Sequence, residues 1–118
     1  MHFEGRDLKP YAEPVTADVL KEGDIYFDVG FVDDNMLVPI MEPVVFIGRN
    51  LGDGDVNEFY FQDFESYRNG VRFETAVRGD AAEFEVGEGR PPQHIYEFDK
   101  AIDVLLSCTL RRRKQDER

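Results

Sequence analysis

The fold of this protein is decided by one stretch, Ile25–Asn69, which has the sequence IYFDVGFVDDNMLVPIMEPVVFIGRNLGDGDVNEFYFQDFESYRN. Its first part, residues 25–32, alternates large apolar residues with small or polar ones. That period of two predicts a strand with one buried face. The predicted buried face is made of Ile25, Phe27, Val29 and Phe31.

The remainder of this stretch predicts further strands and a short helix. Residues 36–41 are apolar but contain a proline, so we expect an edge strand or an extended loop there. The unbroken apolar run at residues 44–47 predicts a strand covered on both faces, and residues 58–62 predict the next strand. Asp63 precedes the helix expected at residues 64–68 and is placed to cap its first turn.

Outside this stretch the sequence predicts an irregular arm, a loose hairpin and one long helix. Residues 1–15 contain two prolines and show no sustained period, which indicates the arm. Residues 83–86 and 94–97 are short strand candidates, and the turn-forming GEGRPPQ between them predicts that they pair with each other. Residues 98–113 have the period of an amphipathic helix, and residues 114–118 follow it as a tail. The apolar face of this helix is predicted to contain Phe98, Ala101, Ile102, Leu105, Leu106 and Thr109, with Leu105 at its centre.

These elements together predict an α+β fold in a single domain that spans residues 1–118. We expect a small, twisted, mainly antiparallel sheet of about five strands, either open or curled toward a barrel. The C-terminal helix is expected to lie across one face of that sheet.

The charge of the chain is strongly negative and unevenly distributed. Residues 1–110 contain 9 Lys and Arg against 23 Asp and Glu, whereas residues 111–118 contain 5 basic and 2 acidic side chains. The formal net charge is −11. Nucleic-acid binders attract phosphates with clustered basic residues, so no nucleic-acid partner is predicted. Solubility explains the acidic surface most simply, and a basic protein partner is the alternative.

Three features bear on location. No apolar run approaches the roughly 20 residues that a membrane-spanning helix needs, so no membrane association is predicted. The first ten residues lack the basic start and apolar stretch of a signal peptide. The single cysteine, Cys108, has no partner for an internal disulfide. We therefore expect a cytoplasmic protein.

The glycine-rich segment at residues 48–54, GRNLGDG, follows a predicted strand as a phosphate-binding loop does. It lacks the Lys-Ser/Thr pair that enters a helix in such loops, so no phosphate site is predicted. Residues 53–57, DGDVN, begin like a calcium loop, but an EF-hand requires Gly and Glu where Glu58 and Phe64 stand. A simple turn is the favoured interpretation, and a weak cation site is the alternative.

Other chemically suggestive residues have simple structural interpretations. Five aromatic residues lie within nine positions of one another, namely Phe59, Tyr60, Phe61, Phe64 and Tyr67. Their neighbours are acidic, which argues against base stacking and favours core packing, with a protein-binding surface as the alternative. Cys108 is predicted to be buried as a small hydrophobe. His94 is the only histidine outside the arm, and it forms no zinc set of the usual spacing. We therefore predict no catalytic residues, no metal ligands and no cofactor.

Two classes of function are compatible with these observations. The favoured class is a non-catalytic acidic binding or regulatory protein that engages another, basic protein. The alternative is a small-ligand or cation-binding domain, with or without weak enzymatic activity, that uses the loop at residues 48–58. A homo-oligomer is compatible with either class. The expected binding surface consists of that loop and the short helix after Asp63, with the residues Arg49, Asn50, Asp53, Asp55, Glu58, Tyr60 and Tyr67.

Overall fold

The protein is described by a computed structural model at residues 2–3, 6–7, 12–76 and 81–116. Its main sheet has five antiparallel strands in the spatial order β6-β5-β4-β3-β7. These strands are β3 (Ile25–Phe31), β4 (Pro39–Arg49), β5 (Glu58–Asp63), β6 (Phe84–Glu88) and β7 (Ile95–Tyr96). The helices are the 3₁₀ turn η1 (Ala17–Val19), α1 (Phe64–Arg68) and α2 (Phe98–Asp116). The predicted α+β arrangement is confirmed, but the sheet does not close into a barrel, so that alternative is wrong.

The N-terminal arm and the C-terminal tail both differ from their predictions. Two short strands, β1 (His2–Phe3) and β2 (Arg6–Asp7), pair with each other inside the arm that was expected to be irregular. At the other end, α2 continues through Lys114 to Asp116, so the predicted tail is largely helical. A run of four basic residues, 111–114, favours this extension because cations stabilise the negative end of a helix dipole.

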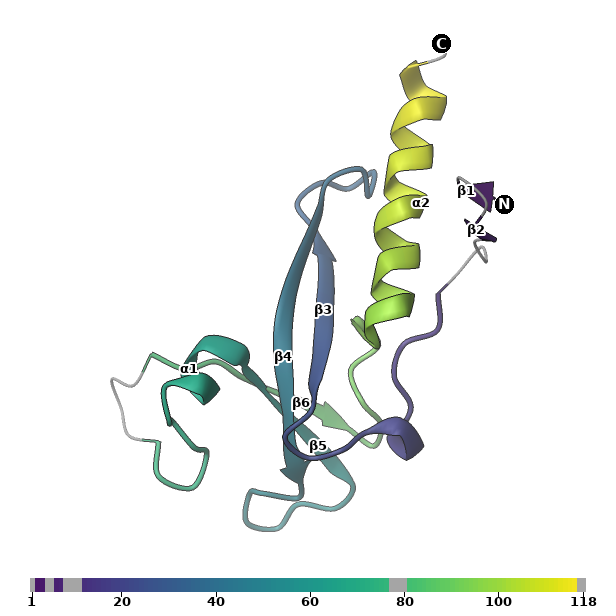
Figure 1. Cartoon of the computed structure of the whole chain (residues 1–118). Helices are drawn as coiled ribbons and strands as arrows, with labels where there is room; N and C mark the ends of the chain where they lie inside the picture. Colours follow the sequence, from purple (N-terminus) through teal and green to yellow (C-terminus); the bar gives the residue numbers. More distant parts are fainter. Residues whose placement is uncertain (1, 4–5, 8–11, 77–80, 117–118) are drawn as a thin grey trace.

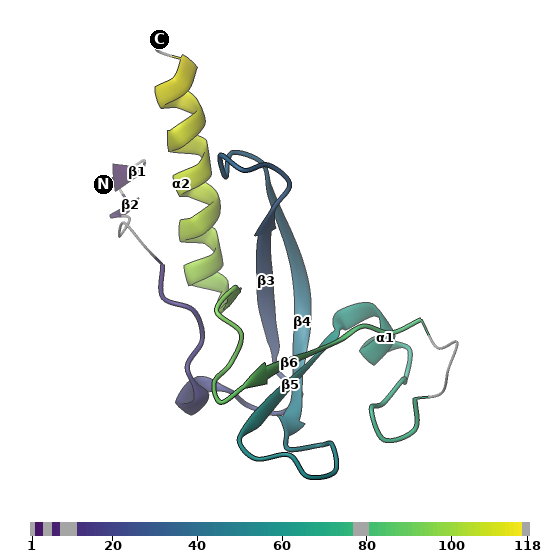
Figure 2. The ribbon, with the colours of Figure 1, turned by 180° about the vertical axis from the view of Figure 1, so that it is seen from behind.

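The two faces of the sheet are covered by different parts of the chain. Figures 1 and 2 show α2 alongside the β3–β4 hairpin, while β5 and β6 cross the lower end of β4. On the face opposite α2, a buried cluster forms around the segment that leads into β3. Its buried members are Val15, Tyr26, Val44, Phe46, Phe59, Phe61 and Ile95. Tyr26 fixes the segment over the sheet, since its hydroxyl donates to the Val19 carbonyl (3.0 Å) and accepts from the Lys21 amide (2.9 Å).

This double cover corrects the prediction of a single buried face for β3. Tyr26 is buried and Ile25 is 46% exposed, the reverse of the expected pattern at the start of the strand. Val29, on the α2 face, is buried as expected. The alternation in the sequence correctly assigns the residues of β3 to its two faces. It does not show that the segment leading into β3 covers the face that contains Tyr26.

The helix α2 packs through a smaller and differently centred face than its sequence predicts. Ala101 and Cys108, seven residues apart, have no exposed surface, whereas Phe98 is 58% exposed and Leu105 is only partly buried. At 100° per residue, the midpoint between Ala101 and Cys108 is rotated by about 50°, roughly a seventh of a turn, from the predicted centre at Leu105. Small residues at the contact let the helix lie close to the hairpin. The prediction that Cys108 is buried is confirmed.

The long strand β4 changes its surroundings along its length. Val44 and Val45 pair with both β3 and β5, and the residues from Phe46 to Arg49 pair with β5. Residues 39–43 pair with β3 alone among the described strands. That half-paired stretch contains Pro39 and Pro43, and prolines are tolerated at sheet edges because they lack an amide hydrogen. The edge character predicted for residues 36–41 therefore holds for the first half of β4.

The predicted hairpin of residues 83–86 with 94–97 is wrong in its pairing. Both segments contain strands, but β6 pairs with β5 and β7 pairs with β3, at opposite edges of the sheet. The connection between them, residues 89–94, therefore crosses from one edge to the other. This crossing creates the candidate site described next.

Candidate functional site

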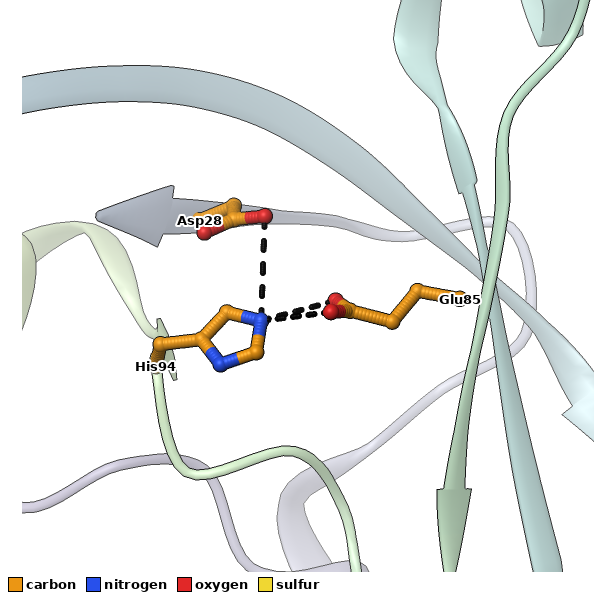
Figure 3. Close-up of side chains that lie close together, drawn as sticks. All are labelled: Asp28, Glu85 and His94. Atoms are coloured by element: carbon orange, nitrogen blue, oxygen red, sulfur yellow. Dashed lines mark hydrogen bonds and ion pairs between the residues drawn. The ribbon is translucent and has the colours of Figure 1, made fainter. Parts of the chain in front are cut away.

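Residues from three parts of the sheet meet near the crossing connection: Asp28 on β3, Glu85 on β6, and His94 just before β7 (Figure 3). The Nε2 atom of His94 lies 2.7 and 2.9 Å from the two carboxylate oxygens of Glu85 and 3.8 Å from Oδ2 of Asp28. In a flat sheet β6 and β3 would be about 14 Å apart, three strand spacings. Their side chains meet because the sheet curls and the crossing connection carries His94 over its face.

Local sequence features explain this curvature. A β-bulge between Phe46 and Gly48 shifts the register of β4 against β5, and bulges increase the twist of a strand. The connection also folds tightly back onto β6 at Gly87. A Cβ atom at Gly87 would lie 2.3 Å from the Arg90 carbonyl oxygen, which is closer than real contacts allow. Glycine at this position therefore permits the crossing that positions His94.

Burial and neighbouring charges perturb Asp28. Burial raises the pKa of its carboxyl group; His94 opposes this shift, while the negative charges of Glu85 and Glu42 add to it. The side chains are accessible to different degrees, with Asp28 33%, Glu85 41% and His94 45% exposed. The cluster is thus reachable from solvent, with Asp28 at its most enclosed side.

The cluster borders an acidic hollow of about 420 Å³. Its acidic lining residues are Asp28, Glu42, Asp63, Glu83 and Glu85, and its apolar floor includes Val44, Phe61 and Phe84. A second hollow of about 660 Å³ shares Glu42, Asp63 and Glu83 with the first. We call the two together the acidic hollow. Among the described residues, no Lys or Arg side chain lies within ion-pair distance of Glu42 or Glu83.

Asp63 has a structural task within this lining. Its carboxylate accepts hydrogen bonds from the amides of Ser66 (2.9 Å) and Glu83 (2.8 Å), so the predicted cap of α1 is confirmed. Burial raises the pKa of Asp63, but the hydrogen bonds from Glu83 and Ser66 outweigh burial, and the net shift is downward. Asp63 therefore stays ionised and links β5, α1 and the segment before β6.

The residues predicted from the sequence lie elsewhere, and most of them bond within their own loop. The Asn50 side chain accepts a hydrogen bond from the Glu58 amide (2.8 Å). The Asp55 carboxylate accepts hydrogen bonds from the Gly52 amide (2.8 Å) and from the Tyr60 hydroxyl. Arg49 donates to Asn57 and stacks on Phe59. Among the seven, only Asp53 is an exposed acid with no bonding partner among the described residues.

The two tyrosines differ in exposure from what a binding anchor requires. Tyr60 is only 6% exposed, and its hydrogen bond to Asp55, followed by burial, raises the pKa of its hydroxyl. Tyr67 is partly exposed and lies under the guanidinium group of Arg72, 3.9 Å from its ring centre. Phe59 and Phe61 are buried, as core packing predicts. The structure therefore does not gather the seven predicted residues into one open surface.

Sequence reasoning missed the Asp28–Glu85–His94 cluster for an identifiable reason. The search for ligands used sequence spacing, and these residues come together only through the crossing connection. One local signal was present: Asp28 is a carboxylate in the middle of the otherwise apolar and aromatic strand IYFDVGF. A charged residue in such a place generally has a partner or a task.

No protein-family model matches the chain, and neither the curated proteins nor the solved structures include a detectable relative. In the part of the chain that the structure describes, α2 and the shorter helices are too short or too polar to cross a membrane.

Proposed function

We propose that this protein is a non-catalytic binding protein that engages a basic partner protein through the acidic hollow. The observation that carries this proposal is the convergence of carboxylates from β3, β4, β6 and the segment before β6 on one hollow. Within the described residues, Glu42 and Glu83 have no cationic partner there. A Lys or Arg side chain of the partner would supply the missing positive charge.

The apolar floor supports a protein partner over a free cation. Pro43, Phe64 and Ala82 also line the hollow and are partly or fully exposed, so the stem of an incoming Lys or Arg has apolar surface to cover. Charge complementarity of this kind mainly raises the association rate and selects the partner, and buried contacts supply the affinity. We retain from the sequence the expectations of a cytoplasmic location, a single domain and no nucleic-acid partner.

The test compares two charge-matched double variants of the full chain. Glu42→Lys with Glu83→Lys reverses the charge at the rim of the acidic hollow and keeps all three side chains of the Asp28–Glu85–His94 cluster. Asp34→Lys with Asp53→Lys makes the same change in net charge at two exposed turns, one of which is the loop predicted from the sequence. Both are used with wild type to capture partners from the native host in the presence of EDTA, and captured proteins are then tested in purified form.

We expect a basic protein to bind wild type and the turn variant with equal affinity, with the hollow variant weakened at least about tenfold. Added salt should weaken the wild-type complex because the contact is electrostatic. Equal binding by both variants would exclude the hollow. Loss of binding only in the turn variant would move the partner site to one of its two turns, and the single variants Asp34→Lys and Asp53→Lys would show whether it is the loop at residues 48–58.

A further inference from the structure

We propose that Asp28, Glu85 and His94 form a binding site for one divalent transition-metal ion, with Zn²⁺ as the best fit. This site requires no partner protein, so it goes beyond the function proposed above. It rests on the convergence of one imidazole and two carboxylates from three separate segments of the chain (Figure 3).

The spacing of the three ligand atoms fits a small ion. Zinc binds His nitrogen and carboxylate oxygen at about 2.0–2.2 Å, which places neighbouring ligand atoms of a tetrahedron about 3.4 Å apart. Here Nε2 of His94 lies 2.7 Å from Glu85 Oε1 and 3.8 Å from Asp28 Oδ2, and all three ligand atoms lie within 4.8 Å of one another. Side-chain movements of about 1 Å are enough to reach tetrahedral spacing.

The ligand types select the class of ion. Imidazole favours Zn²⁺, Cu²⁺, Fe²⁺ and Ni²⁺, whereas Mg²⁺ and Ca²⁺ prefer sites built from oxygen alone. Two carboxylates and a neutral imidazole together carry the charge that one divalent cation balances. Nearby Glu42 adds negative potential. In the absence of metal, the His94 Nε2–Glu85 contact needs a shared proton, and the ion replaces that proton.

The site has room for a fourth ligand. It borders the part of the acidic hollow that measures about 420 Å³, so three protein ligands leave one position open to water. Catalytic sites for zinc use three protein ligands and an open position of this kind. The ion would also link β6 to β3 and to the segment before β7. In the sheet, β6 forms backbone hydrogen bonds with β5 and not with β3 or β7.

The experiment titrates the purified full-length chain with Zn²⁺ at pH 7.5 by calorimetry, with the imidazole resonances of His94 followed by NMR. We expect saturable binding of one ion per chain and a shift of the His94 signals. His94→Ala, Glu85→Gln and Asp28→Asn should each weaken binding by more than about tenfold, because outer-shell changes alone cost 10–100-fold.

Two controls match these variants. His2→Ala removes the other histidine of the chain, and Glu88→Gln removes an exposed carboxylate from the strand that carries Glu85; both should keep the affinity within about threefold. Circular dichroism shows whether each variant is folded. Unchanged affinity in His94→Ala, a stoichiometry other than one, or His94 resonances that do not move in wild type at 1 mM Zn²⁺ (roughly the weakest affinity of interest) would overturn the site. None of these outcomes affects the partner test, which is made in EDTA.

Discussion

The acidic hollow and the loop at residues 50–57 are both polar and acidic, but their side chains are used differently. In the loop, the side chains of Asn50 and Asp55 accept hydrogen bonds from amides eight and three residues away, at Glu58 and Gly52, and so fix the shape of the loop itself. At the edge of the hollow, the side chains of Asp28, Glu85 and His94 come from distant segments and, among the described residues, have only one another as hydrogen-bond or ion-pair partners. Side chains that bond within their own loop indicate a structural role. Polar side chains that meet from segments far apart in the sequence indicate a binding site.

The largest expected effect tests the crossing that creates this convergence. Gly87→Ala places a Cβ against the Arg90 carbonyl oxygen and the Pro92 ring, at 2.3 and 2.6 Å. We expect a loss of more than about 3 kcal/mol in the free energy of unfolding, because backbone must move. Gly30→Ala is the control, since a Cβ there meets nothing within 4 Å, and it should cost less than about 0.5 kcal/mol. Urea denaturation of both variants is the measurement; equal losses would contradict the tight crossing.

A smaller effect is expected at Asp63, which lines the hollow but whose carboxylate serves as the N-terminal cap of α1. Asp63→Ala should lower the free energy of unfolding by about 1–2 kcal/mol at pH 7, because a helix cap is lost. The pKa of Asp63 is lowered from 3.8 in the folded protein, so its contribution is present above that value. It is lost as the pH falls through the folded pKa. Denaturation at pH 7 and below pH 3 should therefore show the difference between wild type and variant narrowing in acid; a constant difference would disprove the role of its charge.

In the loop, substitutions of Asn50 test whether its local hydrogen bond stabilises the folded protein. Its φ of 56° lies in the left-handed region, which Asn adopts more readily than Ala. Asn50→Ala should cost about 1–2 kcal/mol through backbone strain and the lost hydrogen bond to the Glu58 amide. Asn50→Gly relieves the strain alone and should cost roughly half as much. Thermal and urea unfolding of the two variants separates the contribution of backbone strain from that of the lost hydrogen bond. Equal losses in the free energy of unfolding would mean that the backbone strain is negligible.

The smallest effect is expected in the cluster itself when no metal is present. Glu85→Gln removes one charge from a pair whose side chains are 41% and 45% exposed. Solvent screening limits such pairs, so the change in EDTA should be less than about 1 kcal/mol. Adding Zn²⁺ should then stabilise wild type and leave the variant unchanged, because binding to the folded state raises its stability. A large loss in EDTA would indicate a structural pair rather than a vacant ligand set.

Much of the fold follows from local patterns that are visible in the sequence. The alternation around Phe27, the apolar run at Val44 and the helical period after Phe98 each predicted an element that the structure contains. These patterns depend on a few neighbouring residues, so one sequence is enough to find them.

The candidate site could not be predicted in the same way. The turn residues between β6 and β7 are equally suited to a hairpin and to a crossing, and only the free edge of β3 decides where β7 pairs. Placing His94 beside Glu85 required that long-range choice. The loop around Asn50 attracted attention because polar residues are dense there, yet density of polar residues does not distinguish self-bonded loops from surfaces that bind.

The two prolines of β4 have a consequence for how copies of this chain meet. Amides of alternate residues in a strand point to the same side, and the Phe46 amide bonds toward the β3 side, to the Asp24 carbonyl (3.1 Å). Pro39 and Pro43 therefore occupy positions whose amides would face away from β3. Met41 is left as the single outward donor of residues 39–43. A strand from a second molecule would need three backbone N–H donors along this edge, and only one is present. The exposed edge of the hairpin therefore disfavours pairing with a second molecule into a continuous sheet.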